Sequence, residues 1–178
     1  MRLFIAVNFS EDIKTNLYTT AMRLKDRARY GNFSRRENLH LTLVFIGETG
    51  KLSDVKAAMD KVAFSPFEIE MSRLGRFKRS GGDIYWVGVE KSDELSRIAG
   101  ELSDNLRAAG FKIESREFKP HLTLAREVVM EDDFDMRDFS RSIKPMNFKV
   151  SRISLMKSER IAGKLTYSEV YGVSSKNV

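Results

Sequence analysis

The sequence predicts an α+β fold of two pseudo-symmetric lobes, within one domain that spans residues 1–178. Segments with apolar residues at every third or fourth position alternate with short segments of strand periodicity. The tetrapeptide His-Leu-Thr-Leu occurs twice, at residues 40–43 and 121–124, and the copies are 81 residues apart, close to half of the chain. No linker rich in Pro, Gly or Ser separates two independent domains.

The chain begins with a predicted strand and a predicted helix. Residues 3–9 are mostly apolar and indicate a strand, and Ser10 is a good N-cap for the helix after it. The apolar stripe of this helix consists of Ile13, Leu17, Ala21, Leu24 and Ala28. Residues 31–32, Gly-Asn, are expected to break the helix and lead to a strand at residues 39–46, which contains the first His-Leu-Thr-Leu.

A second helix and a hairpin are predicted next. The helix covers residues 53–62 and cannot continue past Pro66. Residues 67–71 alternate apolar and polar side chains, which indicates a half-buried strand. A turn at residues 80–83 and an apolar run at residues 84–89 complete the hairpin.

The remaining elements repeat this order. Ser92 is the predicted N-cap of a third helix, which Gly110 terminates. Its apolar stripe consists of Leu95, Ile98, Leu102 and Leu106. The second His-Leu-Thr-Leu strand follows, then an acidic loop or short helix at residues 131–135. The chain ends in two predicted strands, at residues 148–157 and 165–173.

Composition restricts the class of protein. A net charge of +6 and a pI near 9.5 favour an anionic partner, because a positive field attracts phosphates. The absence of cysteine excludes disulfides and thiolate metal sites and agrees with a reducing compartment. The apolar N-terminus is too short for a signal peptide, and no apolar run approaches the roughly twenty residues of a membrane helix. We therefore expect a soluble cytoplasmic monomer without a membrane segment.

The two tetrapeptides contain the only histidines of the chain. In a strand, His40 and Thr42 point to one face while Leu41 and Leu43 point to the other, and the second copy behaves in the same way. If pseudo-symmetry brings the strands together, two imidazoles and two hydroxyls face one another. Such a site suits acid–base catalysis at phosphorus, in which one imidazole takes a proton from water and the other protonates the leaving oxygen. Symmetry leaves open which histidine has which role.

Other chemistries have less support. A zinc site requires about four ligands, drawn mostly from His and Cys, and the chain has two histidines and no cysteine. No Gly-x-x-x-x-Gly-Lys-Ser/Thr loop for ATP is present. We therefore predict neither a metal nor a cofactor. The simplest structural alternative is two strands that share a pattern by chance, each with an ordinary histidine.

The paired motifs resemble those of the two-histidine phosphoesterase superfamily. The opening residues 2–7, the segments 37–48 and 118–126, and the region of Ser158 and Tyr167 are similar to RNA 2′,3′-cyclic phosphodiesterases, also called 2′-5′ RNA ligases. The resemblance implies antiparallel sheets that line a central cleft, with helices outside. It also implies metal-free and ATP-independent hydrolysis of a terminal 2′,3′-cyclic phosphate of RNA to a 2′-phosphate, with possible reverse 2′-5′ ligation.

The resemblance also implies roles for five residues. His40 is the proton donor to the leaving 3′ oxygen, and His121 is the proton acceptor that activates water. Thr42 and Thr123 bind the phosphate, and Arg126 adds a charge-assisted contact. Arg126 poses a geometric difficulty, because alternation from His121 gives Ala125 the site-facing position. It reaches the site only if the strand ends or bulges there; otherwise it is an ordinary surface arginine.

Two further points stay open in the sequence. Arg73, Arg76, Lys78 and Arg79 are interleaved with aromatic residues, as in surfaces that bind a nucleic-acid backbone and stack bases. The same pattern fits a solvated hairpin whose aromatic residues belong to the core. The alternatives to the RNA enzyme are a phosphodiesterase for small cyclic nucleotides or 2′-5′ oligonucleotides, and a non-catalytic module that binds RNA ends.

Overall fold

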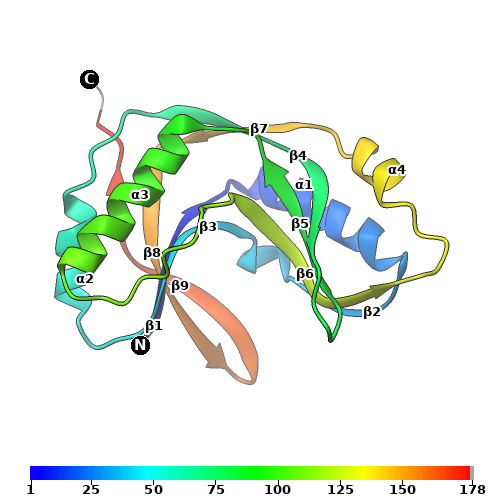
Figure 1. Ribbon diagram of the computed structural model, residues 1–178, viewed down its shortest axis with the longest axis horizontal. Coiled ribbons are helices and arrows are strands. Elements are labelled where there is room, and N and C mark those ends of the chain that lie inside the picture. Colours follow the sequence, from blue (N-terminus) through cyan, green and yellow to red (C-terminus); the bar gives the residue numbers. More distant parts are fainter. Residues whose placement is uncertain (177–178) are drawn as a thin grey trace.

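The computed structural model describes residues 1–176 and contains two antiparallel sheets with helices on their outer sides (Figure 1). This confirms the predicted α+β fold with two sheets. The four-stranded sheet has the order β3-β1-β8-β9, with β1 at Arg2–Asn8, β3 at His40–Glu48, β8 at Arg152–Ile161 and β9 at Lys164–Ser174. The five-stranded sheet has the order β2-β6-β5-β4-β7, with β2 at Ala28–Phe33, β4 at Phe67–Phe77, β5 at Asp83–Val89, β6 at His121–Met130 and β7 at Met146–Val150.

Helices α1 and α3 each follow a strand of one sheet and pack against the other sheet. Helix α1 (Glu11–Lys25) follows β1 of the four-stranded sheet but contacts β2 and β6 of the five-stranded sheet. Helix α3 (Asp93–Ala108) follows β5 of the five-stranded sheet but contacts β3 of the other. Short helices α2 (Leu52–Asp60) and α4 (Met136–Arg141) lie against β9 and β4, respectively. This packing of each helix on the other sheet joins the lobes, and one cluster of buried side chains includes residues of both sheets.

The predicted stripes form the core. Leu17, Ala21 and Leu24 of α1 are fully buried, as are Leu95, Ile98, Leu102 and Leu106 of α3. Ser92 caps α3 by accepting a hydrogen bond from the Leu95 amide at 3.2 Å. Ser10 stands at the N-cap of α1, but its side chain makes no capping bond.

The prediction for residues 26–33 was wrong. Helix α1 ends at Lys25, and Ala28 begins β2 rather than extending the helix stripe. Residues 31–32 do not break a helix but lie inside this strand. A side chain at Gly31 would approach Val128 of β6 to 2.9 Å, so glycine permits the close contact of the two strands.

The prediction of one strand at residues 148–157 was also wrong. Residues 148–157 were expected to form one strand, but β7 ends at Val150 and β8 begins at Arg152 in the other sheet. Ser151 and Arg152 are both exposed, so burial does not alternate through this point. The alternation of faces is interrupted at this point, and the chain crosses from one sheet to the other here. Within residues 1–176, no helix is long and apolar enough to span a membrane.

Candidate active site

The two His-Leu-Thr-Leu segments occupy the first positions of β3 and β6. Leu41, Leu43, Leu122 and Leu124 are buried, whereas both histidines and both threonines are partly exposed. The strand alternation expected from sequence is therefore present in both copies. Strands β3 and β6 contact each other although they belong to different sheets. The structure thus brings the two histidine–threonine pairs together.

Each imidazole is held by the same backbone contact. His40 Nδ1 lies 2.6 Å from the carbonyl oxygen of Asn38, and His121 Nδ1 lies 2.6 Å from that of Lys119. Because a carbonyl only accepts, the hydrogen-bond network assigns the proton of each neutral ring to Nδ1. Nε2 of each ring is then the atom that can exchange a proton with a substrate.

Aromatic rings fix each imidazole from the side. His40 contacts Phe4 and Tyr167, with ring centroids 4.8 and 5.1 Å away. His121 contacts Phe77 and Trp86, at 5.1 and 5.8 Å. These contacts restrict the rings and remove water from them.

The threonines differ in what they contact. Thr42 Oγ1 lies 3.0 Å from His40 Nε2, so the hydroxyl and the imidazole already share a hydrogen bond. Within residues 1–176, His121 Nε2 makes no hydrogen bond to a side chain. Thr123 pairs in register with Trp86 of β5. The site is therefore symmetric in its frame but not in its polar contacts.

A bulge of the kind that Arg126 would require is present in β6. In the pairing of β5 with β6, Tyr85 is opposite Ala125 but Trp86 is opposite Thr123, so Leu124 is an extra residue. Leu124 and Ala125 are both buried, and the next side chain, Arg126, is exposed, as expected if the bulge turns it to the histidine face. Its positive charge lowers the pKa of both His40 and His121.

The first motif has the same bulge, which the sequence did not indicate. Ile5 is opposite Val44 and Ala6 is opposite Thr42, so Leu43 is the extra residue. The counterpart of Arg126 is Phe45, which is 50% exposed and has the Arg2 guanidinium 5.2 Å from its ring centre. The two lobes thus present an arginine and a phenylalanine at equivalent positions.

Burial is the main cause of the shifted pKa values. Loss of solvent lowers the pKa of His40 and of His121, while the hydrogen bonds from Nδ1 to the backbone oppose this. Nearby cations lower the two pKa values further, Arg126 for both and Lys14 of α1 for His40. Both imidazoles therefore favour the neutral form before an anion binds.

Several neighbours of the histidines were not predicted as site residues from the sequence. Phe4 was assigned only to a strand and Tyr167 only to the region of resemblance, and Lys14 lies on a helix for which only the apolar stripe was predicted. Phe4 lies on β1, next to β3, whereas Tyr167 lies on β9 at the opposite edge of the same sheet, and both rings contact His40. Predicting these neighbours would have required the order of the strands in the sheet, which the periodicity of the sequence does not give.

The basic and aromatic segment at residues 73–86 belongs partly to the core and partly to the candidate site. Tyr85 is only 2% exposed and belongs to the core, whereas Phe77 and Trp86 border His121. Arg73 pairs with Glu90, and Arg76 with Asp83. Two aromatic residues therefore belong to the candidate site, while two of the cations are already paired.

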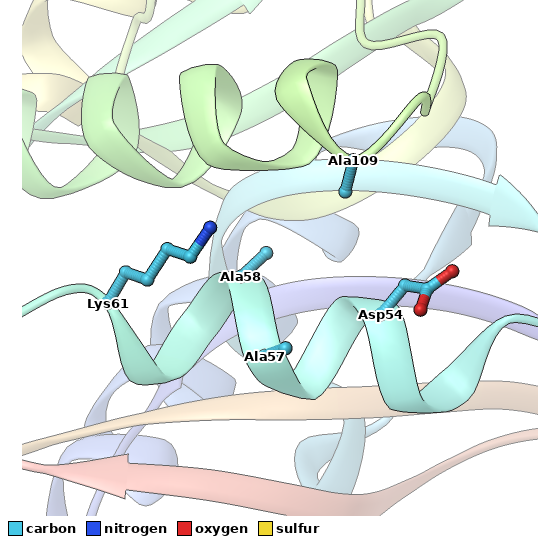
Figure 2. Close-up of a pocket in the computed structure, with 5 residues that line it drawn as sticks. All are labelled: Asp54, Ala57, Ala58, Lys61 and Ala109. Atoms are coloured by element: carbon cyan, nitrogen blue, oxygen red, sulfur yellow. The ribbon is translucent and has the colours of Figure 1, made fainter.

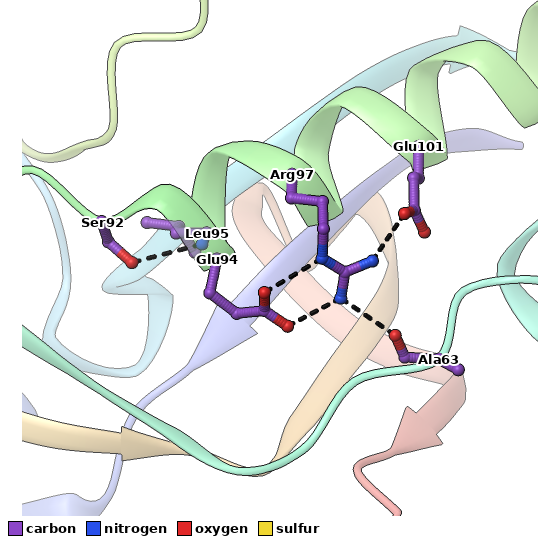
Figure 3. A network of polar contacts seen from close by, with 6 residues as sticks. All are labelled: Ala63, Ser92, Glu94, Leu95, Arg97 and Glu101. Carbon is purple, nitrogen blue, oxygen red and sulfur yellow. Dashed lines mark hydrogen bonds and ion pairs between the residues drawn. The ribbon is translucent and has the colours of Figure 1, made fainter.

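Two hollows of the surface lie away from both histidines. One, of about 280 Å³, lies between α2 and the end of α3 and is lined by Asp54, Lys61 and three alanines (Figure 2). The other, of about 460 Å³, borders Phe64, Phe67 and Arg97. Arg97 binds Glu94, Glu101 and the carbonyl of Ala63, which connects α3 to the segment after α2 (Figure 3). Its donors are thus used for structure.

The arrangement of the histidines defines the class of site. Two oriented imidazoles lie on contacting strands, each of which also carries a partly exposed threonine, and the charge of Arg126 lowers the pKa of both rings. These groups suit proton transfer at a bound phosphate. Among residues 1–176, no cluster of three or more His, Cys, Asp or Glu side chains has the form of a metal site.

The chain belongs to the 2′-5′ RNA ligase superfamily, whose family model matches residues 12–162. It is 34% identical over 129 residues to the RNA 2′,3′-cyclic phosphodiesterase of Archaeoglobus fulgidus, covering 71% of this chain and 72% of that protein. It is 29% identical over 163 residues to the protein of that name from Thermotoga maritima, covering 89% and 87%. E. coli LigT complexed with 3′-AMP shares the fold, with a TM-score of 0.81 at 22% identity over 99% of this chain and 98% of that one.

Proposed function

We propose that this protein is an RNA 2′,3′-cyclic phosphodiesterase, which hydrolyses the cyclic phosphate at an RNA end to a 2′-phosphate. The observation that carries the proposal is the pair of imidazoles held through Nδ1 to the backbone, on contacting strands, with Arg126 near both. The curated relatives with the name RNA 2′,3′-cyclic phosphodiesterase support the choice of substrate.

In the proposed mechanism, His121 Nε2 accepts a proton from water as the water oxygen bonds to phosphorus. His40, protonated at Nε2, donates its proton to the 3′ oxygen as the bond from phosphorus to that oxygen breaks. The products are a 2′-phosphate and a 3′-hydroxyl. The division of roles follows the family resemblance of the two motifs.

Thr42, Thr123 and Arg126 bind the phosphate in this mechanism. The threonine hydroxyls donate to non-bridging oxygens, and Arg126 compensates the charge that grows on them. The anionic substrate also opposes the low pKa of His40, because a nearby negative charge favours imidazolium. Binding therefore helps to load the acid that the reaction needs.

We propose further that residues 1–178 act as one two-lobed domain and as a monomer in the cytoplasm, without a metal or cofactor. The donor set supports the metal-free mechanism, because both histidines are used in proton transfer and the chain has no cysteine. In reverse, the same groups would join a cyclic end to a 5′-hydroxyl and form a 2′-5′ linkage.

The test uses purified protein, EDTA and an RNA that ends in a 2′,3′-cyclic phosphate, with no nucleotide added. We expect turnover and a product that carries only a 2′-phosphate, identified by mass spectrometry and by comparison with both synthetic isomers. Binding without turnover would indicate an RNA-end-binding module. A 3′-phosphate product or a need for added metal would contradict the mechanism.

A further inference from the structure

The hairpin of β8 and β9 projects beyond the rest of the molecule, and its turn lies at the free end (Figure 1). Ala162 and Gly163 form this turn with φ values of 48° and 77°, as two-residue hairpin turns require. Near the turn, Ile161 is 51% exposed and Leu165 is 39% exposed. The end of the hairpin therefore presents apolar side chains to solvent.

One face of this hairpin continues the face that carries His40. Tyr167 of β9 contacts both Phe4 and His40, with ring centroids 5.0 and 5.1 Å away. Leu165 is two residues from Tyr167 and therefore points to the same side, and its cross-strand partner there is Arg160. Ile161 and its partner Lys164 point to the opposite side.

Hydrogen bonds hold this surface in a fixed position beside the histidine. The carbonyl oxygen of Leu165 accepts from the guanidinium of Arg35 and from Asn38 Nδ2, the latter at 3.0 Å. The backbone carbonyl of the same Asn38 holds His40 Nδ1. We call Arg35, Arg160 and Leu165 the hairpin strip.

Of the two guanidinium groups of the hairpin strip, that of Arg35 is paired with Glu37, and that of Arg160 is the one that suits a nucleic-acid strand. Arg160 is held by a hydrogen bond to the Gly163 carbonyl at 3.0 Å, and within residues 1–176 no carboxylate pairs with it. On the opposite face, Lys157 is paired with Glu159 at 2.6 Å. An exposed apolar side chain next to a guanidinium can pack against a base while the cation binds a phosphodiester.

We propose that the hairpin strip binds the nucleotide next to the terminal one, with its base against Leu165 and the linking phosphodiester at Arg160. This inference rests on the proposed function and names its substrate class: oligonucleotides with a 2′,3′-cyclic end, rather than free cyclic nucleotides. A mononucleotide has only the phosphate that reacts, so it cannot use the strip.

The test compares kcat/KM for a nucleoside 2′,3′-cyclic monophosphate and for a trinucleotide with the same terminal nucleoside. We expect the protein to prefer the trinucleotide, and Arg160→Gln to reduce the ratio of the two kcat/KM values about tenfold through loss of a charge-assisted contact. Leu165→Ser should also reduce this ratio. Lys164→Gln is the matched control, because it removes one charge from the opposite face of the same hairpin and should leave the ratio unchanged.

Salt dependence provides a second measurement. If Arg160 binds one phosphate, Arg160→Gln should reduce the slope of log(kcat/KM) against log[salt] for the trinucleotide by about 0.7. An equal preference of the unchanged protein for both substrates would overturn the inference while leaving the phosphodiesterase activity established. Equal effects of Arg160→Gln and Lys164→Gln would also overturn it. Hydrolysis of neither substrate would instead contradict the proposed function.

Discussion

Strands β3 and β6 have the same motif, the same bulge after the threonine and the same backbone contact to the imidazole, but different surroundings. Strand β3 is at the edge of the four-stranded sheet, whereas β6 is inside the five-stranded sheet between β2 and β5. What the strands share is what any proton-transferring histidine requires, namely a ring held through Nδ1, so that Nε2 is the atom that exchanges the proton. What they do not share must distinguish the two roles.

The distinguishing features lie on both sides of the site. His40 is bonded to Thr42 and its strand carries Phe45, while His121 has no such bond and its strand carries Arg126. Asn38, next to His40, also binds β9 through its side chain, whereas the side chain of Lys119 lies near Glu117.

The largest effect should come from the histidines. We expect His40→Asn and His121→Asn each to lower kcat for a cyclic-phosphate RNA by about 10² to 10⁴. If His40 is the acid, replacing the 3′ bridging oxygen of the substrate by sulfur should restore most of the activity of His40→Asn, because a thiolate leaves without a proton. His121→Asn should stay impaired with the sulfur substrate. The opposite pattern would reverse the assignment, and full activity of either variant would disprove its role.

Arg126→Gln should produce the next largest effect, a fall in kcat/KM of about 10- to 100-fold from loss of a charge-assisted phosphate contact. Its removal should also raise the pKa of both histidines, since its charge lowers both. NMR titration of the imidazole protons would measure the two shifts. Arg141→Gln on α4 is the control and should change neither kcat/KM nor these pKa values. A shift at only one histidine would show that Arg126 does not lie between them.

The motif was the part of this site most open to prediction from sequence. Alternation alone places His40 with Thr42 and His121 with Thr123, because the leucines between them must be buried. Arg126 could not be placed in this way, since a bulge changes the alternation and depends on the pairing partner. Phe45 was missed for the same reason.

The fold shows the same limit of local patterns. The stripes of α1 and α3 were predictable, because 3.6-residue periodicity is a property of the segment itself. Strand β2 was not, because it pairs with β6, a partner far away in the chain, and Gly31 lies close to Val128 of that strand. The sheet to which β7 or β8 belongs is likewise decided by residues far away in the chain.

Protonation of the two histidines should make folding stability depend on pH. Their pKa values are lower in the folded protein than the ordinary 6.5, so the unfolded chain takes up protons first as the pH falls. Their contribution to stability is therefore complete above pH 6.5 and is lost as the pH falls toward the folded pKa values. Each histidine can contribute a slope of at most about 1.4 kcal/mol per pH unit.

Urea denaturation from pH 7.5 to pH 5 would measure this dependence. His40→Gln should remove more of the slope than His121→Gln, because the His40 contact with its backbone carbonyl is part-buried and that of His121 is exposed. The control is Arg141→Gln, which should keep the slope of the unchanged protein. Equal slopes in all four proteins would show that neither histidine is responsible.

The smallest effect should come from the side chain that anchors His40 to β9. Asn38→Ala keeps the backbone carbonyl that holds Nδ1 but removes the donor to Leu165, so the carbonyl becomes less well fixed. We expect kcat to fall about fivefold, the size of one neutral hydrogen bond. Lys119→Ala is the matched change at the other histidine and should leave kcat unchanged. NMR should show a shift of the His40 imidazole signals alone in Asn38→Ala, whereas equal losses of kcat in both variants would mean that the β9 anchor does not distinguish the two strands.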